Sequence, residues 1–131
     1  MYLDFTDYFG EDYSDYMSYD PKAFSRAFKK IEDIFETIAG KFYFNLCRYI
    51  TWYGSRKEKE YTAYAGEISF FDDKEKFSFS ISFKVYVYKR KTRLLFPIPV
   101  NLIEKKIEEY YLETLDFDEK LEYYSKKKGN K

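Results

Sequence analysis

The chain has 131 residues, which is long enough for one domain with its own core. Aromatic residues make up 24% of it and charged residues 35%, which excludes a disordered chain and indicates a dense core under an ionised surface. The formal net charge is zero, so no overall charge draws the protein to nucleic acid or to an anionic membrane.

Targeting and redox signals favour the inside of a cell. The start of the chain is acidic and lacks the basic and apolar parts of a secretory signal. Residues 94–103, the longest charge-free apolar stretch, are too few to cross a bilayer. The single cysteine, Cys47, excludes an internal disulfide and suits a reducing compartment. We expect a cytoplasmic protein, in the host cytoplasm if it is viral, with no membrane partner.

Acidic and tyrosine residues alternate at the start of the chain. Residues 1–21 hold six acids and no base. Tyrosine is enriched at binding hot spots, and acids steer a surface toward basic partners. Residues 1–19 are therefore predicted to be a protein-binding segment, either flexible or docked on the chain's own basic regions. Its binding residues are predicted to be Asp7, Tyr8, Asp12, Tyr13, Asp15, Tyr16 and Tyr19.

An amphipathic helix is predicted next. Asp20 is suited to cap it, Pro21 to occupy its first turn, and Gly40 to end it. Between these residues, apolar side chains recur every three or four positions. Such a stripe is typical of a helix that packs one face against a core.

Three antiparallel strands are expected at residues 41–53, 61–71 and 77–88, with polar turns between them. Gly66, in the second strand, is a candidate β-bulge. In the third strand Phe, Ile and Val alternate with Ser, Lys and Tyr, so one face is apolar.

A short fourth strand at residues 93–96 can follow the basic tip "KRKT", before prolines end the pairing. The third strand then lies at or near the sheet edge, where its run "FSFSISF" needs cover. The fourth strand, the N-terminal segment or another chain are the three candidates. Cover by another copy would make a homodimer.

Two helices are predicted near the C-terminus. Asn101 is expected to cap the first, and Asp116 or Asp118 the second. The second carries few apolar residues, among them Leu121 and Tyr124.

Residues 125–131, "SKKKGNK", are predicted to form a frayed basic tail. Together the elements predict a single α+β domain: one helix, an antiparallel meander of three or four strands, then one or two helices packed on the sheet.

Enzymatic chemistry is not expected. The chain has no histidine and one cysteine, which excludes ordinary zinc sites and histidine-based nucleophile pairs. Carboxylate pairs remain, and they can act as acid and base or hold Mg²⁺. However, Asp72 and Asp73 fit a polar turn, and Glu108, Glu109 and Glu113 fit a solvated helix face. We predict no catalytic residues, metal, cofactor or small-molecule substrate.

The polar face of the predicted sheet is a second candidate site. Tyr43, Tyr49 and Tyr53 are expected on it, with either Tyr61 or Tyr64 according to register. A tyrosine-lined sheet beside basic loops can stack bases and hold phosphates, unless the C-terminal helices or the N-terminal segment cover it. This nucleic-acid-binding alternative rests on Arg56, Lys57, Tyr86, Tyr88, Lys89, Arg90, Lys91 and Arg93.

Three functions remain open. The leading hypothesis is a small protein-interaction module that binds a host or self partner through the acidic segment and the tyrosine face. The alternatives are a nucleic-acid-binding protein and a structural or virion subunit. The scarcity of Asn and Gln beside abundant Lys and Glu fits a hyperthermophile, or else an AT-rich gene. A viral or mobile-element accessory role, such as inhibition of a host machine, fits that composition.

Overall fold

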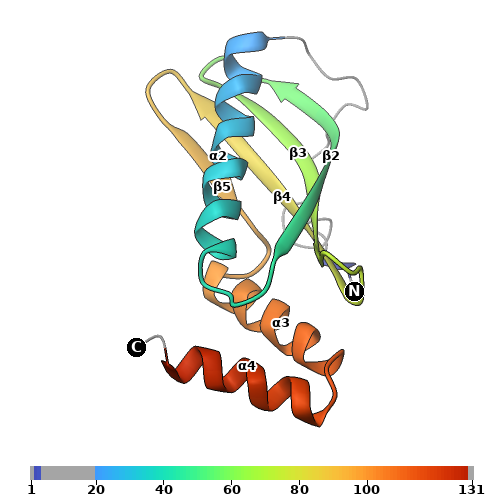
Figure 1. Ribbon diagram of the computed structural model, residues 1–131. Coiled ribbons are helices and arrows are strands. Elements are labelled where there is room, and N and C mark those ends of the chain that lie inside the picture. The colour runs from blue at the N-terminus through green and yellow to red at the C-terminus, as the bar shows by residue number, and fades with distance from the viewer. Residues whose placement is uncertain (1, 4–19, 130–131) are drawn as a thin grey trace.

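The computed structural model describes residues 2–3 and 20–129 (Figure 1). One helix precedes an antiparallel sheet and two helices follow it, which confirms the predicted α+β class. The strands are β1 (Tyr2–Leu3), β2 (Leu46–Lys57), β3 (Tyr61–Asp72), β4 (Ser78–Tyr88) and β5 (Thr92–Leu95). The helices are α2 (Pro21–Ala39), α3 (Val100–Glu113) and α4 (Phe117–Gly129).

Helix α2 begins and ends where the sequence predicts. The carboxylate of Asp20 accepts a hydrogen bond from the backbone N–H of Ala23 at 3.2 Å, and Pro21 occupies the first turn. At the other end, the N–H of Gly40 donates to the carbonyl of Glu36 at 3.0 Å. These caps satisfy backbone groups that a helix end leaves unpaired. The helix therefore has fixed limits before it meets the sheet.

Strand β4 lies inside the sheet and not at its edge. It pairs with β3 on one side. On the other side, β5 pairs with residues 84–87 and β1 pairs in parallel with Ser80 and Ile81. Of the three predicted candidates for cover, two are therefore present together: the fourth strand, as β5, and the N-terminal segment, as β1. Both belong to the same chain as β4. Among the described strands, β2 is the outer one at the opposite edge.

The core lies between α2 and one face of the sheet, here called the inner face. Every second residue of β4 points to it, and these side chains are buried. Each such side chain contributes on the order of 1.5–3 kcal/mol to folding by leaving water. The ring of Trp52 on β2 packs on two other rings, with its centre 4.9 Å from that of Phe24 in α2 and 5.2 Å from that of Phe83 in β4. The apolar residues of β4 on this face are Phe79, Ile81, Phe83, Val85 and Val87.

The predicted bulge at Gly66 is wrong, because the shift of register falls on the neighbouring strand, between Trp52 and Gly54. Gly66 has a different role. A Cβ atom there would lie 2.4 Å from the carbonyl oxygen of Thr51 and 2.8 Å from the ring of Phe83. Only glycine lets these two neighbours approach so closely.

Strand β2 also differs from its predicted limits of 41–53. It starts at Leu46 and continues to Lys57, so only residues 58–60 are left to turn the chain. Gly54 and Ser55, which favour turns in isolation, are paired with Ala65 and Tyr64 of β3. Pairing with the long strand β3 overrides the local preference.

Helix α3 packs its residues Ile103 and Ile107, both fully buried, against the lower part of the core. It begins at Val100 after Pro99, without a side-chain cap, so the predicted cap at Asn101 is wrong. The proline fixes its own backbone angle and starts the helix two residues earlier. No helix in the described part of the chain is long and apolar enough to cross a membrane.

Helix α4 is capped by a reciprocal pair. Asp116 accepts from the N–H of Glu119 at 2.8 Å, and Glu119 accepts from the N–H of Asp116 at 3.1 Å. This result selects Asp116 over Asp118 as the cap. The helix runs to Gly129, so residues 125–129 are helical where a frayed tail was predicted. Basic side chains in the last turn favour this extension, because they complement the negative helix end.

Candidate functional site

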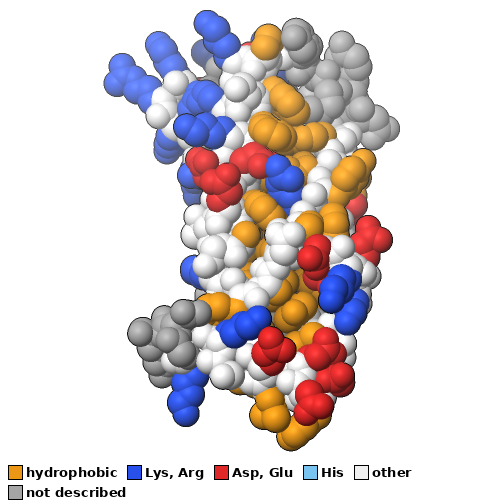
Figure 2. All heavy atoms as spheres, in the orientation of Figure 1, with side chains coloured by type: hydrophobic (Ala, Val, Ile, Leu, Met, Phe, Trp, Pro, Cys, Tyr) orange, Lys and Arg blue, Asp and Glu red, His pale blue; other side chains and the backbone are white. Residues whose placement is uncertain are grey.

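Lysine and arginine side chains gather at the end of the molecule where α2 begins (Figure 2). Three segments meet there: the first turns of α2, the turn between β2 and β3, and the turn between β4 and β5. We call this region the basic end. Its positive residues are Lys22, Arg26, Arg56, Lys57, Lys59, Lys89, Arg90, Lys91 and Arg93.

A hollow of about 350 Å³ lies at the basic end. Five basic and three acidic residues line the hollow, so its lining carries an excess of positive charge. The hairpin tip beside it adds Arg90 and Lys91, both exposed, without a nearby acid in the sequence. A protein surface attracts a polyanion most strongly where acidic residues do not neutralise its basic side chains. The charged lining residues are Asp20, Lys22, Arg26, Lys57, Glu58, Lys59, Glu60 and Lys89.

Arg26 fixes the helix to the hairpin tip. Its Nη1 donates to the carbonyl oxygen of Tyr88 at 2.5 Å and lies 3.5 Å from that of Lys89. The residues are 62 positions apart in the chain, so this contact brings the start of α2 beside the tip. Because carbonyl groups carry no net charge, the contact places Arg26 without neutralising it.

Three tyrosine rings meet next to the hollow. The ring of Tyr61 lies 5.3 Å from that of Tyr86 and 5.5 Å from that of Tyr88. The ammonium group of Lys91 lies 5.0 Å from the centre of the Tyr88 ring. Arg56 donates to the hydroxyl of Tyr61 at 3.1 Å and to Glu58 at 2.7 Å. The structure thus brings the residues of the nucleic-acid alternative into one region.

The strand register decides between the two tyrosines that the sequence left open. Tyr61 pairs with Tyr88 on the outer face, whereas Tyr64 pairs with Val85 and is fully buried on the inner face. Burial, and then the charge of Asp20, raise the pKa of Tyr64. Tyr61 is therefore the residue that joins the site.

The predicted tyrosine face is not one continuous patch. Tyr49 and Tyr53 stay exposed on β2. Tyr43 precedes the strand and contacts Tyr123 of α4 at 6.2 Å, far from the basic end. Helix α3 packs on the inner face, since the ring centre of its Tyr110 lies 5.7 Å from that of the inner-face residue Phe79.

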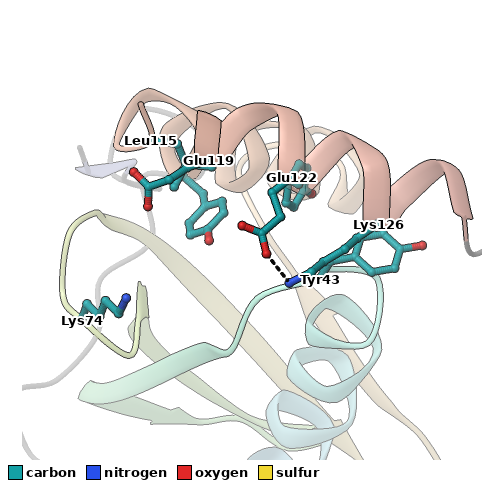
Figure 3. Close-up of a pocket in the computed structure, with 8 residues that line it drawn as sticks. Tyr43, Lys74, Leu115, Glu119, Glu122 and Lys126 are labelled. Atoms are coloured by element: carbon teal, nitrogen blue, oxygen red, sulfur yellow. Dashed lines mark ion pairs between the residues drawn. The ribbon is translucent and has the colours of Figure 1, made fainter. Parts of the chain in front are cut away.

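A second pocket, of about 240 Å³, lies beneath α4 (Figure 3). Two acids and two bases line it, and Lys126 and Glu122 form an ion pair at 3.4 Å. This balance gives the pocket no charge with which to select a ligand. Its lining residues are Tyr43, Lys74, Tyr111, Leu115, Glu119, Glu122, Tyr123 and Lys126.

The pocket's tyrosines attach α4 to the body of the protein. The hydroxyl of Tyr123 donates to Glu108 of α3 at 2.9 Å. Burial and this hydrogen bond raise the pKa of Tyr123 above its ordinary value. Tyr111 stacks on Phe44 at 3.7 Å, and burial followed by the charge of Asp72 raises its pKa. These groups are held in their neutral form and pack as part of the core.

Two of the carboxylates considered for chemistry, Asp72 and Glu108, have structural partners. Asp72 accepts from the backbone N–H groups of Lys76 and Phe77, as turn residues do. Glu108 accepts from Tyr123 and from Lys127, which lies 3.0 Å away. Within residues 2–3 and 20–129, no three Cys, Asp or Glu side chains gather where they could hold a metal ion.

Some functional residues could not be found from the sequence. Lys22, Arg26 and Lys59 join the basic end only because α2 and the β2–β3 turn meet the hairpin tip. A local pattern of charges does not show which distant segment it meets. The predicted protein-binding residues from Asp7 to Tyr19 lie outside the described residues.

No protein-family model, curated protein or solved structure matches this chain.

Proposed function

We propose that the protein binds nucleic acid through the basic end. The observation that carries the proposal is the hollow with its excess of bases beside three contacting tyrosine rings. Positive side chains bind phosphates and release the ions condensed on them, which supplies most of the affinity of such proteins. Aromatic rings add stacking area for bases.

Each part of the site has a role in this proposal. Lys22, Lys57 and Lys89 would hold phosphates at the rim of the hollow, since their side chains are exposed there. Arg26 holds the tip in place. Unpaired bases can reach the rings of Tyr61 and Tyr88, whereas a duplex keeps its bases stacked inside. The site therefore favours a single strand over a duplex.

A binding titration tests the proposal. Fluorescence anisotropy would be measured with labelled single-stranded and double-stranded DNA of about 20 nucleotides. The variant Lys89→Glu/Lys91→Glu should lower affinity about 30-fold or more, because two positive charges at the hairpin tip become negative and repel phosphates. The matched control, Lys74→Glu/Lys105→Glu, makes the same change of charge at exposed positions away from the basic end. Equal loss in both variants, or no binding by the original chain, would overturn the proposal.

A protein-binding role for the acidic segment is a second candidate, and the charge pattern of the sequence favours it. Residues 1–21 carry six acids and no base, whereas residues 77–97 carry five bases and no acid. Opposite charges attract, so the acidic segment is suited to dock on basic residues, within one chain or between copies.

The variant Asp7→Asn/Asp12→Asn/Asp15→Asn tests this second candidate. If the segment docks within the chain, thermal stability should fall. If it joins copies, the light-scattering mass should fall. The control replaces three other acids, Asp33, Glu36 and Glu109, which are exposed on helices α2 and α3. Unchanged mass and stability would contradict the candidate. A structural subunit would instead show stable higher oligomers without a ligand.

A further inference from the structure

Helix α4 turns its apolar stripe away from the protein. Phe117, Leu121 and Tyr124 are 74%, 53% and 50% exposed. Their spacing of four and three residues places them on one side of the helix. The opposite side carries Tyr123, which is 4% exposed and faces the pocket beneath the helix.

This arrangement is unusual for a surface helix, which normally buries its apolar stripe. Single exposed apolar residues need no explanation. Among the described residues, eight large hydrophobic side chains are exposed, and three of them share this one stripe. Figure 2 shows apolar side chains at the end of the molecule opposite the basic end. A contiguous exposed group of this kind marks an interaction surface.

The charges of α4 indicate which partner fits. Its first turn carries Asp118 and Glu119, and its last turn carries Lys126, Lys127 and Lys128. A second copy of the same helix, placed antiparallel, puts basic residues beside acidic ones at both ends. A parallel copy would put like charges together. The helix is thus complementary to itself in one orientation only.

The geometry points to a homodimer in which α4 packs antiparallel on α4 of a second copy. The two-fold axis passes between Leu121 and Tyr124, so Leu121 packs on Tyr124 of the second copy and Phe117 lies beside its Lys128. Lys128 extends the stripe and reaches the acidic start of the partner helix, near Asp118. Such a contact uses the same patch on both copies, as two-fold dimers do.

The dimer is expected to be weak, since one helix pair buries less area than a standard interface. We expect a dissociation constant in the micromolar range. The proposal is independent of nucleic-acid binding, because it uses none of the residues of the basic end. It would place the two basic ends at the far ends of the dimer.

Sedimentation equilibrium provides the test, with the full chain at about 5 µM to about 500 µM. The mass should rise with concentration from 16.0 kDa toward twice that value. Leu121→Asp should remain a monomer, with dimerisation weakened at least about 30-fold, because it buries a charge at the axis. The control, Leu102→Asp, makes the same substitution at a leucine of α3 that is 41% exposed. This control should dimerise like the original chain.

A charge exchange tests the antiparallel orientation. Lys128→Glu should weaken the dimer several-fold, because it places like charges beside Asp118 of the partner. The double variant Asp118→Lys/Lys128→Glu should restore it, since the two ends are then complementary again. Circular dichroism confirms that each variant remains folded. A monomer at all concentrations, equal dimerisation of Leu121→Asp and Leu102→Asp, or no restoration by the double variant would overturn the proposal.

Discussion

The basic end and the α4 end of the molecule both carry many charges, but they use them differently. At the basic end bases outnumber acids around a hollow, and Arg26 is held by carbonyl groups that leave its charge intact. At the α4 end Lys126 pairs with Glu122 and Lys127 with Glu108. An apolar stripe is also exposed there. This difference is the reason why we propose a polyanion as the partner of one end and an apolar surface as the partner of the other.

Salt should separate the two ends most strongly. If the basic end contacts about four phosphates, raising salt from about 50 to about 200 mM lowers affinity for single-stranded DNA roughly 50-fold. The α4 contact is mainly apolar, so its dissociation constant should change less than about threefold. Anisotropy and sedimentation at each salt concentration measure the two effects. An equal loss of affinity with salt for DNA binding and for dimerisation would contradict the distinction between the two ends.

A substitution in the sheet between the two ends, Gly66→Ala, should lower the stability of the whole domain. Gly66→Ala places a Cβ atom 2.4 Å from the Thr51 carbonyl oxygen, a backbone atom that cannot move easily. We expect a loss of about 1–3 kcal/mol in the free energy of unfolding. Gly40→Ala is the control, because its Cβ would lie 3.3 Å from the nearest backbone oxygen. Urea unfolding compares them, and equal losses would show that the close approach at Gly66 is unimportant.

Tyr123→Phe should weaken the attachment of α4. It removes the hydrogen bond to Glu108, at a cost of about 1–2 kcal/mol. The variant should also change how stability depends on pH. Since the pKa of Tyr123 is raised in the folded protein, its contribution is complete below about pH 10 and is lost at higher pH.

Urea unfolding at about pH 8 and about pH 11 measures both effects of Tyr123→Phe. The original chain should lose more stability than the variant over this range. Tyr124→Phe, at a half-exposed position on the same helix, is the matched control and should behave like the original chain. If Tyr123→Phe lost as much stability at alkaline pH as the original chain, the alkaline loss would come from other buried tyrosines.

The helix caps should give the smallest effects and compare the two ends directly. Asp116→Ala removes a reciprocal pair of hydrogen bonds, whereas Asp20→Ala removes one bond of 3.2 Å. Both should cost about 0.5–2 kcal/mol, with the larger loss at Asp116. Serine at either position is the control, because it can also cap. Calorimetry measures the order, and the reverse order would show that α2 depends more on its cap.

Local patterns predicted the parts of the fold that local physics controls. Asp20 and Pro21 define the start of α2 by capping and backbone geometry, and Gly40 directly follows its last residue. The alternation in β4 identifies its buried face because side chains in a strand repeat every two residues. The hairpin tip was found for the same reason, since its basic residues are consecutive in the sequence.

Contacts between distant segments decided the rest. The buried residue of α4 is Tyr123, whose hydroxyl donates to Glu108 of α3, and its neighbours Leu121 and Tyr124 are exposed. Arg26 joins the basic end through a carbonyl 62 residues away. Neither contact leaves a periodic signal, because each depends on a single polar group meeting its partner across the fold.

The single tryptophan gives the protein an internal optical probe. Trp52 contacts Phe24 and Phe83, so its indole ring senses whether α2 is packed on the sheet. Its emission should shift to longer wavelength when the core opens and water reaches the ring. Substitutions at the basic end or on the α4 stripe should leave the emission spectrum unchanged. Fluorescence alone can therefore distinguish a lost binding surface from a lost fold, without any added label.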